Sequence, residues 1–225
     1  MGLKFRHEMK HVISPMDRLV LKQRLDVVAQ PDPHARGGNY HIRSLYFDNI
    51  YDKALAEKIN GTARREKFRI RYYNGDTGFI HLEKKSKIVN LSSKQSTLIT
   101  ATEAQHIIDN DLDWMMESGN PLVEELYTKM RGQGIKPKTI TDYIRDPYIF
   151  APGNVRVTID YNIRTGIRCG DFLNNDCVTV PVCENIIILE VKWDEYLPDI
   201  IRDIVQLKDR RTCSFSKYAA CRLYG

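Results

Sequence analysis

Charged side chains recur at every second position in five segments of the chain, and KFRIRYY shows this pattern most clearly. A strand would place Lys67, Arg69 and Arg71 on one face, with neighbours about 6.5 to 7 Å apart. That spacing suits adjacent phosphates of a chain, because each guanidinium presents paired donors. The segment therefore predicts binding of a polyanion, either a triphosphate or a longer chain.

Four further segments carry charge on one face of an expected strand. Their alternating residues are Arg6, Glu8 and Lys10; His81, Glu83, Lys85 and Lys87; Arg156, Thr158, Asp160 and Arg164; and Glu190 with Lys192. An ordinary antiparallel sheet with one solvated face would explain any single segment. Five such segments favour a polar interior surface, because a solvated face would more often mix Thr, Ser and Gln with the charges.

Glu190 is a carboxylate among many cations, and two roles remain open for it. It can form a structural ion pair, or it can hold a divalent metal. Mg²⁺ and Mn²⁺ prefer oxygen ligands and commonly take one or two carboxylates together with substrate phosphates. Glu8 and Glu83 are weaker candidates of the same kind, and ion pairing is the favoured role for Glu83.

The sequence lacks the motifs of several other classes of catalytic and binding site. The sequence has no phosphate-binding GxxxxGK[ST] loop, no GxGxxG, no Ser-His-Asp set and no clustering of its six histidines. Its five cysteines include no CxxC pair, so we expect them to be reduced and structural. Nucleic-acid binding is disfavoured, because Phe68 and Tyr72 alternate with the arginines and Phe79 lies outside them, whereas base stacking needs aromatic and basic groups together.

Length and charge point to one domain with an anionic partner. The 225 residues have a net charge of +5 and are 28% charged, and no linker divides them, so we expect a single domain over residues 1–225. No apolar run approaches the roughly 20 residues that cross a bilayer, and the N-terminus lacks the apolar core of a signal peptide. We therefore expect a cytoplasmic protein.

Local signals predict strands with helices inserted between them. Ser14 and Pro15 begin a helix that extends to about Val28, and Asp48 can cap a short helix over residues 49–59. Asn74 and Gly75 predict a tight hairpin. Further strands are expected at residues 5–13, 40–47, 62–73, 79–89, 92–100, 138–150, 155–166, 177–182 and 185–193, and further helices at 102–110, 121–130, 198–208 and 214–225.

This order of elements predicts an α+β fold with an antiparallel sheet. A sheet with a charged interior face needs water or an anion inside and apolar packing outside. A closed β-barrel with helices packed outside meets both conditions.

Seven motifs in order resemble the VTC-type polyphosphate polymerase domain, a branch of the triphosphate tunnel metalloenzymes. The resemblance runs from about Phe5 to Tyr218, and its motifs are HEMK, SLYFDN, EKFRIRYY, HLEKK, VRVTIDYNI, ILEVK and SFSKY. The family implies an antiparallel tunnel barrel that binds ATP phosphates with Mn²⁺ or Mg²⁺. It also implies growth of a polyphosphate chain by transfer of the γ-phosphoryl group.

The resemblance also implies roles for individual residues. Those that look like catalytic phosphate ligands are Lys10, Arg69, Arg71, Lys85, Arg156 and Lys217. Those expected to bind substrate are Lys94 and Ser216. Arg164 and Lys192, which lie on the charged faces of their expected strands, are also expected to bind substrate. Glu190 looks like the metal carboxylate. The family often works beside membrane proteins, which implies a membrane-protein partner and allows a position at the inner face of the membrane.

Two departures from the family pattern bear on the activity. Ser214 stands where the family's polymerases tend to have Lys, which removes one positive charge from the product path. The first strand has a single Glu-x-Lys, from Glu8 to Lys10, where the hydrolase and cyclase branch has Glu-x-Glu-x-Lys. A polymerase is therefore favoured, and a tripolyphosphatase or a module that only binds ATP or polyphosphate remains an alternative.

Overall fold

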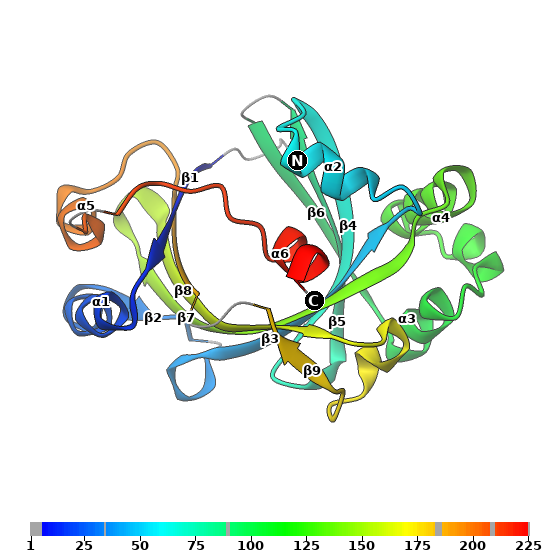
Figure 1. Cartoon of the computed structure of the whole chain (residues 1–225), viewed down its shortest axis with the longest axis horizontal. Coiled ribbons are helices and arrows are strands. Elements are labelled where there is room, and N and C mark those ends of the chain that lie inside the picture. Colours follow the sequence, from blue (N-terminus) through cyan, green and yellow to red (C-terminus); the bar gives the residue numbers. More distant parts are fainter. Residues whose placement is uncertain (1–5, 34, 89–90, 183–185, 208–209, 225) are drawn as a thin grey trace.

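The computed structural model describes residues 6–33, 35–88, 91–182, 186–207 and 210–224, and Cys183 lies outside them. Its centre is one curved antiparallel sheet (Figure 1). The main path of the sheet runs in the order β1 (His7–Ile13), β10 (Ile187–Trp193), β8 (Val155–Gly166), β7 (Lys136–Phe150), β3 (Tyr40–Asp48), β4 (Arg64–Tyr73), β5 (Asp76–Ile88) and β6 (Leu91–Ile99). Two short strands extend it, β2 (Gln30–Pro31) beside β7 and β9 (Thr179–Pro181) beside β8.

The two end strands of this path do not pair with each other in the described part of the chain, so the closed barrel expected from the sequence is not confirmed. Side chains connect the two ends of the sheet instead. Lys85 Nζ on β5 lies 3.6 Å from Glu8 Oε2 on β1. The strong curvature thus brings the first and fifth strands of the chain face to face across the concave side.

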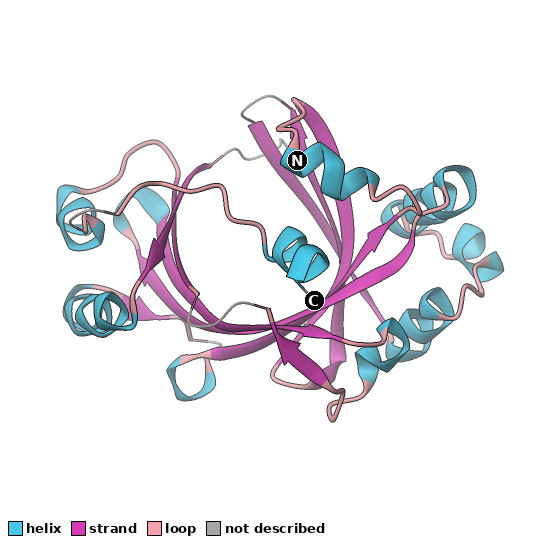
Figure 2. Cartoon of the chain, in the orientation of Figure 1, coloured by secondary structure: helices cyan, strands magenta, loops and turns pink. Residues whose placement is uncertain are grey.

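Helices cover the outer, apolar face of the sheet on two sides (Figure 2). On one side, α1 (Pro15–Val28) and α5 (Asp199–Val205) pack on β8 and β10 in a buried cluster that includes Leu21, Leu25 and Leu189. On the other side lie α3 (Ala101–Ile108) and α4 (Pro121–Gln133). The predicted outer packing is correct for these four helices.

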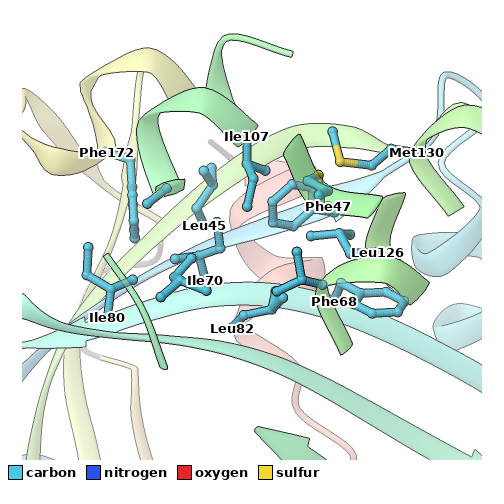
Figure 3. Packing of buried hydrophobic residues seen from close by; sticks show 14 of the residues in the cluster. Leu45, Phe47, Phe68, Ile70, Ile80, Leu82, Ile107, Leu126, Met130 and Phe172 are labelled. Atoms are coloured by element: carbon cyan, nitrogen blue, oxygen red, sulfur yellow. The ribbon is translucent and has the colours of Figure 1, made fainter. Parts of the chain in front are cut away.

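Figure 3 shows the core beneath α3 and α4. Ile70 of β4 and Leu82 of β5 are fully buried there, together with Ile107 of α3 and Leu126 of α4. These strand residues alternate with the charged residues of the same strands, so one face is dry while the other carries charge. The packing of helices outside therefore requires the charges of β4 and β5 to point to the concave side.

Local capping sets the helix starts that the sequence indicates. Ser14 forms a capping box with Asp17 and is followed by Pro15 at the first helical position. The prediction that Asp48 caps the short helix is correct, although α2 (Lys53–Ile59) begins later than expected and Asp48 lies at the end of β3. Asp48 accepts hydrogen bonds from the backbone nitrogens of Ala54 and Leu55.

Turns complete the fold. Asn74 (φ 53°) and Gly75 (φ 71°) both adopt positive φ in the hairpin between β4 and β5, as the predicted tight turn requires. Short 3₁₀ turns occur at Arg36–Gly38, Asp113–Glu117, Pro152–Asn154 and Cys169–Leu173. No helix among the described residues is long and apolar enough to cross a membrane.

The C-terminal helix α6 (Lys217–Tyr224) lies on the concave side of the sheet, as Figure 1 shows in red. The expectation that all helices pack outside is wrong for this helix. Its Ala220 and Cys221 pack with Ile42, Tyr143 and Ile188, which form an apolar patch on the otherwise charged face. The sequence did not indicate this patch, because it is assembled from three separate strands.

Candidate active site on the concave face

Two arginines of β4 form one part of the site. Arg69 and Arg71 alternate along the strand and lie on the concave face, opposite Tyr46 and Ser44 of β3. Arg69 donates from Nε to Glu83 Oε2 at 2.6 Å and from Nη1 to the Tyr46 hydroxyl at 2.8 Å. Arg71 donates from Nε to Ser44 Oγ at 3.2 Å and from Nη1 to the Tyr73 hydroxyl at 3.1 Å.

Glu83 of β5 is the carboxylate of this group. It lies opposite Arg69 in the sheet, 4.0 Å from Arg71, and it also pairs with Lys94 of β6 at 2.5 Å. Burial alone would raise the pKa of Glu83, but the positive charges of Arg69, Arg71 and Lys94 outweigh it and hold the pKa far below its usual range. Glu83 therefore stays ionised at neutral pH.

Glu190 of β10 is the centre of a second group. It is only 5% exposed and lies opposite Lys10 of β1. Its carboxylate oxygens lie 2.6 Å from Lys192 Nζ, 3.7 Å from Arg145 Nη2 and 3.9 Å from Lys10 Nζ. Burial raises the pKa of Glu190, yet these cations bring it well below the usual value.

Glu8 of β1 joins the second group to the first. Its carboxylate lies 2.8 Å from Lys10, 3.6 Å from Lys192 and 3.6 Å from Lys85 on the far side of the concave face. Burial would lower the pKa of Lys10, but Glu190 and Glu8 raise it to about 12. Lys10 is therefore a permanent cation between two carboxylates.

Asp160 of β8 ties the C-terminal helix to the site. It has no exposed surface, and Arg145 of β7 binds it with two hydrogen bonds of 2.6 and 2.8 Å. Lys217, the first residue of α6, lies 2.5 Å from the same carboxylate. Ser216 Oγ accepts a hydrogen bond from Ala219 N at 3.3 Å, so it caps α6 as the sequence predicts.

Taken together, these side chains form what we call the concave cluster. Its nine cations surround four carboxylates, an excess of five positive charges. The carboxylates are Glu8, Glu83, Asp160 and Glu190, and the cations are Lys10, Lys67, Arg69, Arg71, Lys85, Lys94, Arg145, Lys192 and Lys217. Such an excess in a partly dry space favours an anion.

Eight of the eleven expected site residues belong to the concave cluster, and three do not. Arg156 lies on the concave face opposite Lys192 but binds Asp32 with its guanidinium. Ser216 caps α6 beside Lys217 and contributes no charge. Arg164 lies on the other face of the sheet, where it donates to the Thr179 hydroxyl at 2.7 Å.

The expectation for Arg164 is wrong because the alternation of β8 breaks before it. Asn162 adopts a positive φ of 50°, and the pairing with β7 shifts register in this region. Ile163 consequently takes the concave position, in the apolar patch under α6. Arg164 then lies opposite Asp142, whose carboxylate accepts a hydrogen bond from Arg43 on the outer face.

Two cations of the concave cluster were not assigned a role from the sequence. Lys67 shares the alternation of Arg69 and Arg71, and this signal was sufficient to include it. Arg145 alternates with Tyr143 in a strand whose other concave residues are uncharged, so only its contact with Asp160 identifies it. Lys67 lies 5.3 Å from the centre of the Tyr46 ring.

A divalent metal finds few protein ligands here. The described residues include no group of three carboxylate, histidine or cysteine side chains that could hold one. Glu190 and Glu8 are the two carboxylates closest to a shared set of lysines, Lys10 and Lys192. This donor set fits a metal that takes one or two carboxylates from the protein and its other ligands from phosphate oxygens and water.

Comparison with protein families gives one match that spans the chain. The family model of the VTC domain matches residues 5–224. A search of curated proteins finds no match.

Several solved structures are similar to this chain at low sequence identity. The PH1012 protein of Pyrococcus horikoshii OT3 has a TM-score of 0.50 and 10% identity, with coverage of 94% of this chain and 96% of that one. A candidate adenylate cyclase of Bacillus halodurans has a TM-score of 0.48 and 12% identity, covering 85% and 82%. A candidate adenylate cyclase of Vibrio parahaemolyticus has 0.45 and 10%, covering 90% and 83%.

Proposed function

The chain belongs to the VTC domain family, and on that basis we propose that it is a polyphosphate polymerase that transfers the γ-phosphoryl group of ATP to a growing polyphosphate chain. The observation that carries this proposal is the positive excess of the concave cluster. Its cations lie on the concave face and come from strands toward both ends of the sheet and from α6. In this proposal they therefore surround a ligand instead of contacting it from one direction. Linear polyanions match this arrangement.

In the proposed reaction, the bond between the γ-phosphorus of ATP and the bridging β,γ-oxygen breaks, and its electron pair leaves with ADP. A terminal oxygen of the polyphosphate chain forms the new bond to the same phosphorus. The protein has little covalent chemistry to perform in such a transfer, so its work is to position both anions and to neutralise charge. Arg69, Arg71 and Lys217 are suited to the transferred group, since they approach from β4 and α6.

Without substrate, carboxylates of the protein occupy the positions beside the cations where phosphates are proposed to bind. Glu83 holds Arg69, and Asp160 holds Arg145 and Lys217, so the cations are aligned before substrate arrives. A buried guanidinium held by a carboxylate keeps its direction, which lowers the cost of ordering it on binding. Asp160, Glu83 and Glu190 thus act as positioning residues in this proposal.

Mn²⁺ or Mg²⁺ is the proposed metal, with Glu190 as its main protein ligand and Glu8 beside it. When bound, such an ion would neutralise charge on the phosphate oxygens and favour departure of ADP. Lys10 and Lys192 would then have to move away from Glu190 or share it with the metal. We propose a cytoplasmic location at the inner face of a membrane, where a membrane-protein partner can accept the polymer.

Incubation of the purified chain with ATP and Mn²⁺ tests this function, with ADP and polymer measured separately. The wild-type chain is expected to release one ADP for each phosphate added to the polymer. Arg69→Ala and Glu190→Ala are each expected to lower the rate about 10²- to 10³-fold, the usual effect of removing one group that stabilises transition-state charge. Arg131→Ala is the matched control, because this arginine pairs with Asp113 on the outside of α4.

The products decide between the candidate activities. Free phosphate without polymer would identify a hydrolase and contradict the polymerase. Tight binding of ATP without turnover, with either metal, would leave only a binding module. Equal losses in Arg69→Ala and Arg131→Ala would remove the concave cluster from the mechanism.

A further inference from the structure

We infer that three further cations at the rim of the concave face bind the part of a polyphosphate chain that extends beyond the central site. These residues are Lys58 at the last turn of α2, Arg65 of β4 and Lys87 of β5, and we call them the rim group. The inference rests on the proposed function and adds the direction in which the polymer leaves the site.

The pairing of β4, β5 and β6 places like charges side by side. Lys67 lies directly opposite Lys85, and Lys85 lies directly opposite Lys94, so three lysines form one row across three strands. One step further along, Arg65 lies directly opposite Lys87. These five cations, three in the first row and two in the second, lie on the same side of their strands as Arg69 or Glu83. They therefore share the concave face.

Like charges directly opposite each other in a sheet are destabilising. In the first row, Glu8 and Glu83 offset part of this repulsion through Lys85 and Lys94. In the rim group, the described residues place no carboxylate within ion-pairing distance, and Arg65 donates only to the backbone oxygen of Thr62 at 3.1 Å. Among the described residues, no carboxylate therefore offsets the repulsion between Arg65 and Lys87 through an ion pair.

Lys58 lies near enough to Arg65 and Lys87 for their charges to act on it, and its helix α2 packs on β4 (Figure 1). Burial is the first cause that lowers the pKa of Lys58, and the positive charges of Arg65, Lys10 and Lys87 lower it further, while Glu8 opposes them only in part. Cations from three elements therefore converge at this end of the face. An anion between them would relieve the repulsion that each one experiences.

The rim group continues the line of the central arginines. Along β4 the concave positions are Arg71, Arg69, Lys67 and Arg65, each about 6.6 Å from the next. Arg65 is thus roughly 13 Å from Arg69, and a triphosphate held by Arg69 and Arg71 leaves the rim group empty. Only a longer chain can occupy the central arginines and the rim group together. The rim group is therefore specific for the polymer, which leaves the site beside α2.

Binding of two probes to the full chain tests this inference. Inorganic tripolyphosphate reports on the central site, and long-chain polyphosphate reports on the central site and the rim together. The double variant Arg65→Gln, Lys87→Gln is expected to bind the long chain at least tenfold more weakly, and to bind tripolyphosphate within twofold of wild type. The dependence of long-chain affinity on salt should also decrease, since fewer counterions are released.

The matched control is Arg24→Gln with Arg131→Gln, which removes two exposed cations from the outer helices and should change neither affinity. A separate Lys58→Gln variant repeats the test on α2, away from the strands, in case the double variant folds poorly. Equal weakening of both probes, or no weakening of the long chain in either variant, would overturn the inference. Failure of the wild-type chain to bind tripolyphosphate would instead contradict the proposed function.

Discussion

At the scale of single residues, Asp160 shows how the concave cluster is organised. This buried carboxylate receives Arg145 and Lys217 and thereby fixes cations from β7 and α6 at one point. Opposing charges in such a site are costly to separate, because a buried ion that loses its partner keeps its desolvation penalty. The stability of the apo protein should therefore depend on the few carboxylates that the cluster contains.

Asp160→Asn is expected to lower the free energy of unfolding by about 3–5 kcal/mol, since Arg145 and Lys217 both lose their nearest counter-charge. Urea denaturation of the apo protein measures this. The control Asp113→Asn removes the carboxylate of an exposed pair with Arg131, and it should cost no more than about 1 kcal/mol. A loss at Asp160 that is no larger than the loss at Asp113 would contradict the role assigned to Asp160.

Tyr46 adds a titratable hydroxyl to the same face. Burial raises its pKa, but Arg69, Lys67 and Arg71 outweigh burial and lower the pKa to about 7. The hydroxyl accepts from Arg69, and the ring lies beside Tyr218 of α6. Near neutral pH, Tyr46 therefore changes from a neutral phenol to a phenolate that offsets part of the positive excess.

Stability should consequently rise with pH above about 7. Between this folded pKa and the ordinary value of 10.0, the unfolded chain keeps the Tyr46 proton while the folded chain releases it, so unfolding takes up a proton and becomes less favourable as pH rises. The slope from this group is at most about 1.4 kcal/mol per pH unit. The pKa of Lys67 is lowered to about 8, mainly by burial, and its slope has the same sign above that pH.

Denaturation of wild type and Tyr46→Phe from pH 6 to pH 8 isolates the tyrosine, because Lys67 begins to contribute only near the upper end. The wild type should gain stability relative to the variant between pH 7 and pH 8, and tyrosinate absorbance should appear in the folded protein over the same interval. Parallel stability curves without tyrosinate absorbance below pH 9 would show that Tyr46 keeps an ordinary pKa.

The face of the sheet on which a residue lies was predictable from the sequence where a strand alternates without interruption. Arg69, Arg71 and Glu83 follow this rule in β4 and β5, and they meet as expected. Arg164 does not, because one residue with positive φ reverses the alternation of its strand, and Asn162 gives only a weak signal of that. The ion-pair partners themselves depend on how far the sheet curves, which no local pattern specifies.

At the scale of elements, one buried carboxylate contacts both α6 and α2, in addition to the ion pair between Arg222 of α6 and Asp52 at the start of α2. Asp48 at the end of β3 accepts from the backbone of Ala54 and Leu55 and from the Tyr218 hydroxyl. Tyr218 is 1% exposed and packs against Tyr46 and Leu55. The C-terminal helix is therefore attached at its first turn through Lys217 and Tyr218, next to the cations that it helps to position.

Tyr218→Phe is expected to loosen this attachment while keeping the packed ring. Loss of the hydrogen bond leaves a buried carboxylate oxygen with fewer donors and should cost about 1–3 kcal/mol. Amide hydrogen exchange should then become faster in α6 and in the first turn of α2, and remain unchanged in α4. Tyr196→Phe, at an exposed tyrosine, is the matched control. Uniformly faster exchange over the whole sheet would show a general loss of stability and not a local release.

The elements themselves were largely predictable, and their spatial arrangement was less so. The Ser14–Pro15 start and the Asn74–Gly75 turn are local signals, and the structure contains both features as predicted. The position of α6 inside the concave face is not local, since it depends on a patch made by Ile42, Tyr143 and Ile188 from β3, β7 and β10. Closure of the sheet was extrapolated from the charge pattern and the family resemblance, and it is not confirmed, because Glu8 of β1 and Lys85 of β5 meet through side chains without backbone pairing between the end strands of the described sheet.

At the scale of the whole molecule, charge is distributed unequally between the two faces of the sheet. The chain carries a net charge of +5, and the concave cluster alone has an excess of five positive charges. The rest of the molecule is therefore close to balanced, with outer pairs such as Arg131 and Asp113. Self-repulsion is concentrated where substrate is proposed to bind, and an anion placed there should stabilise the entire fold.

Inorganic tripolyphosphate should accordingly raise the melting temperature of the chain. At one hundred times its dissociation constant, a ligand that binds only the folded state contributes about 2.7 kcal/mol, which corresponds to roughly 5–10 °C for a protein of this size. Arg71→Ala should lose most of this shift, whereas Arg131→Ala should keep it. Sodium chloride of equal ionic strength should give a much smaller shift, because it screens the repulsion without bridging the cations. An equal shift with chloride, or the full shift in Arg71→Ala, would mean that the polyanion acts on the surface as a whole and not on the concave cluster.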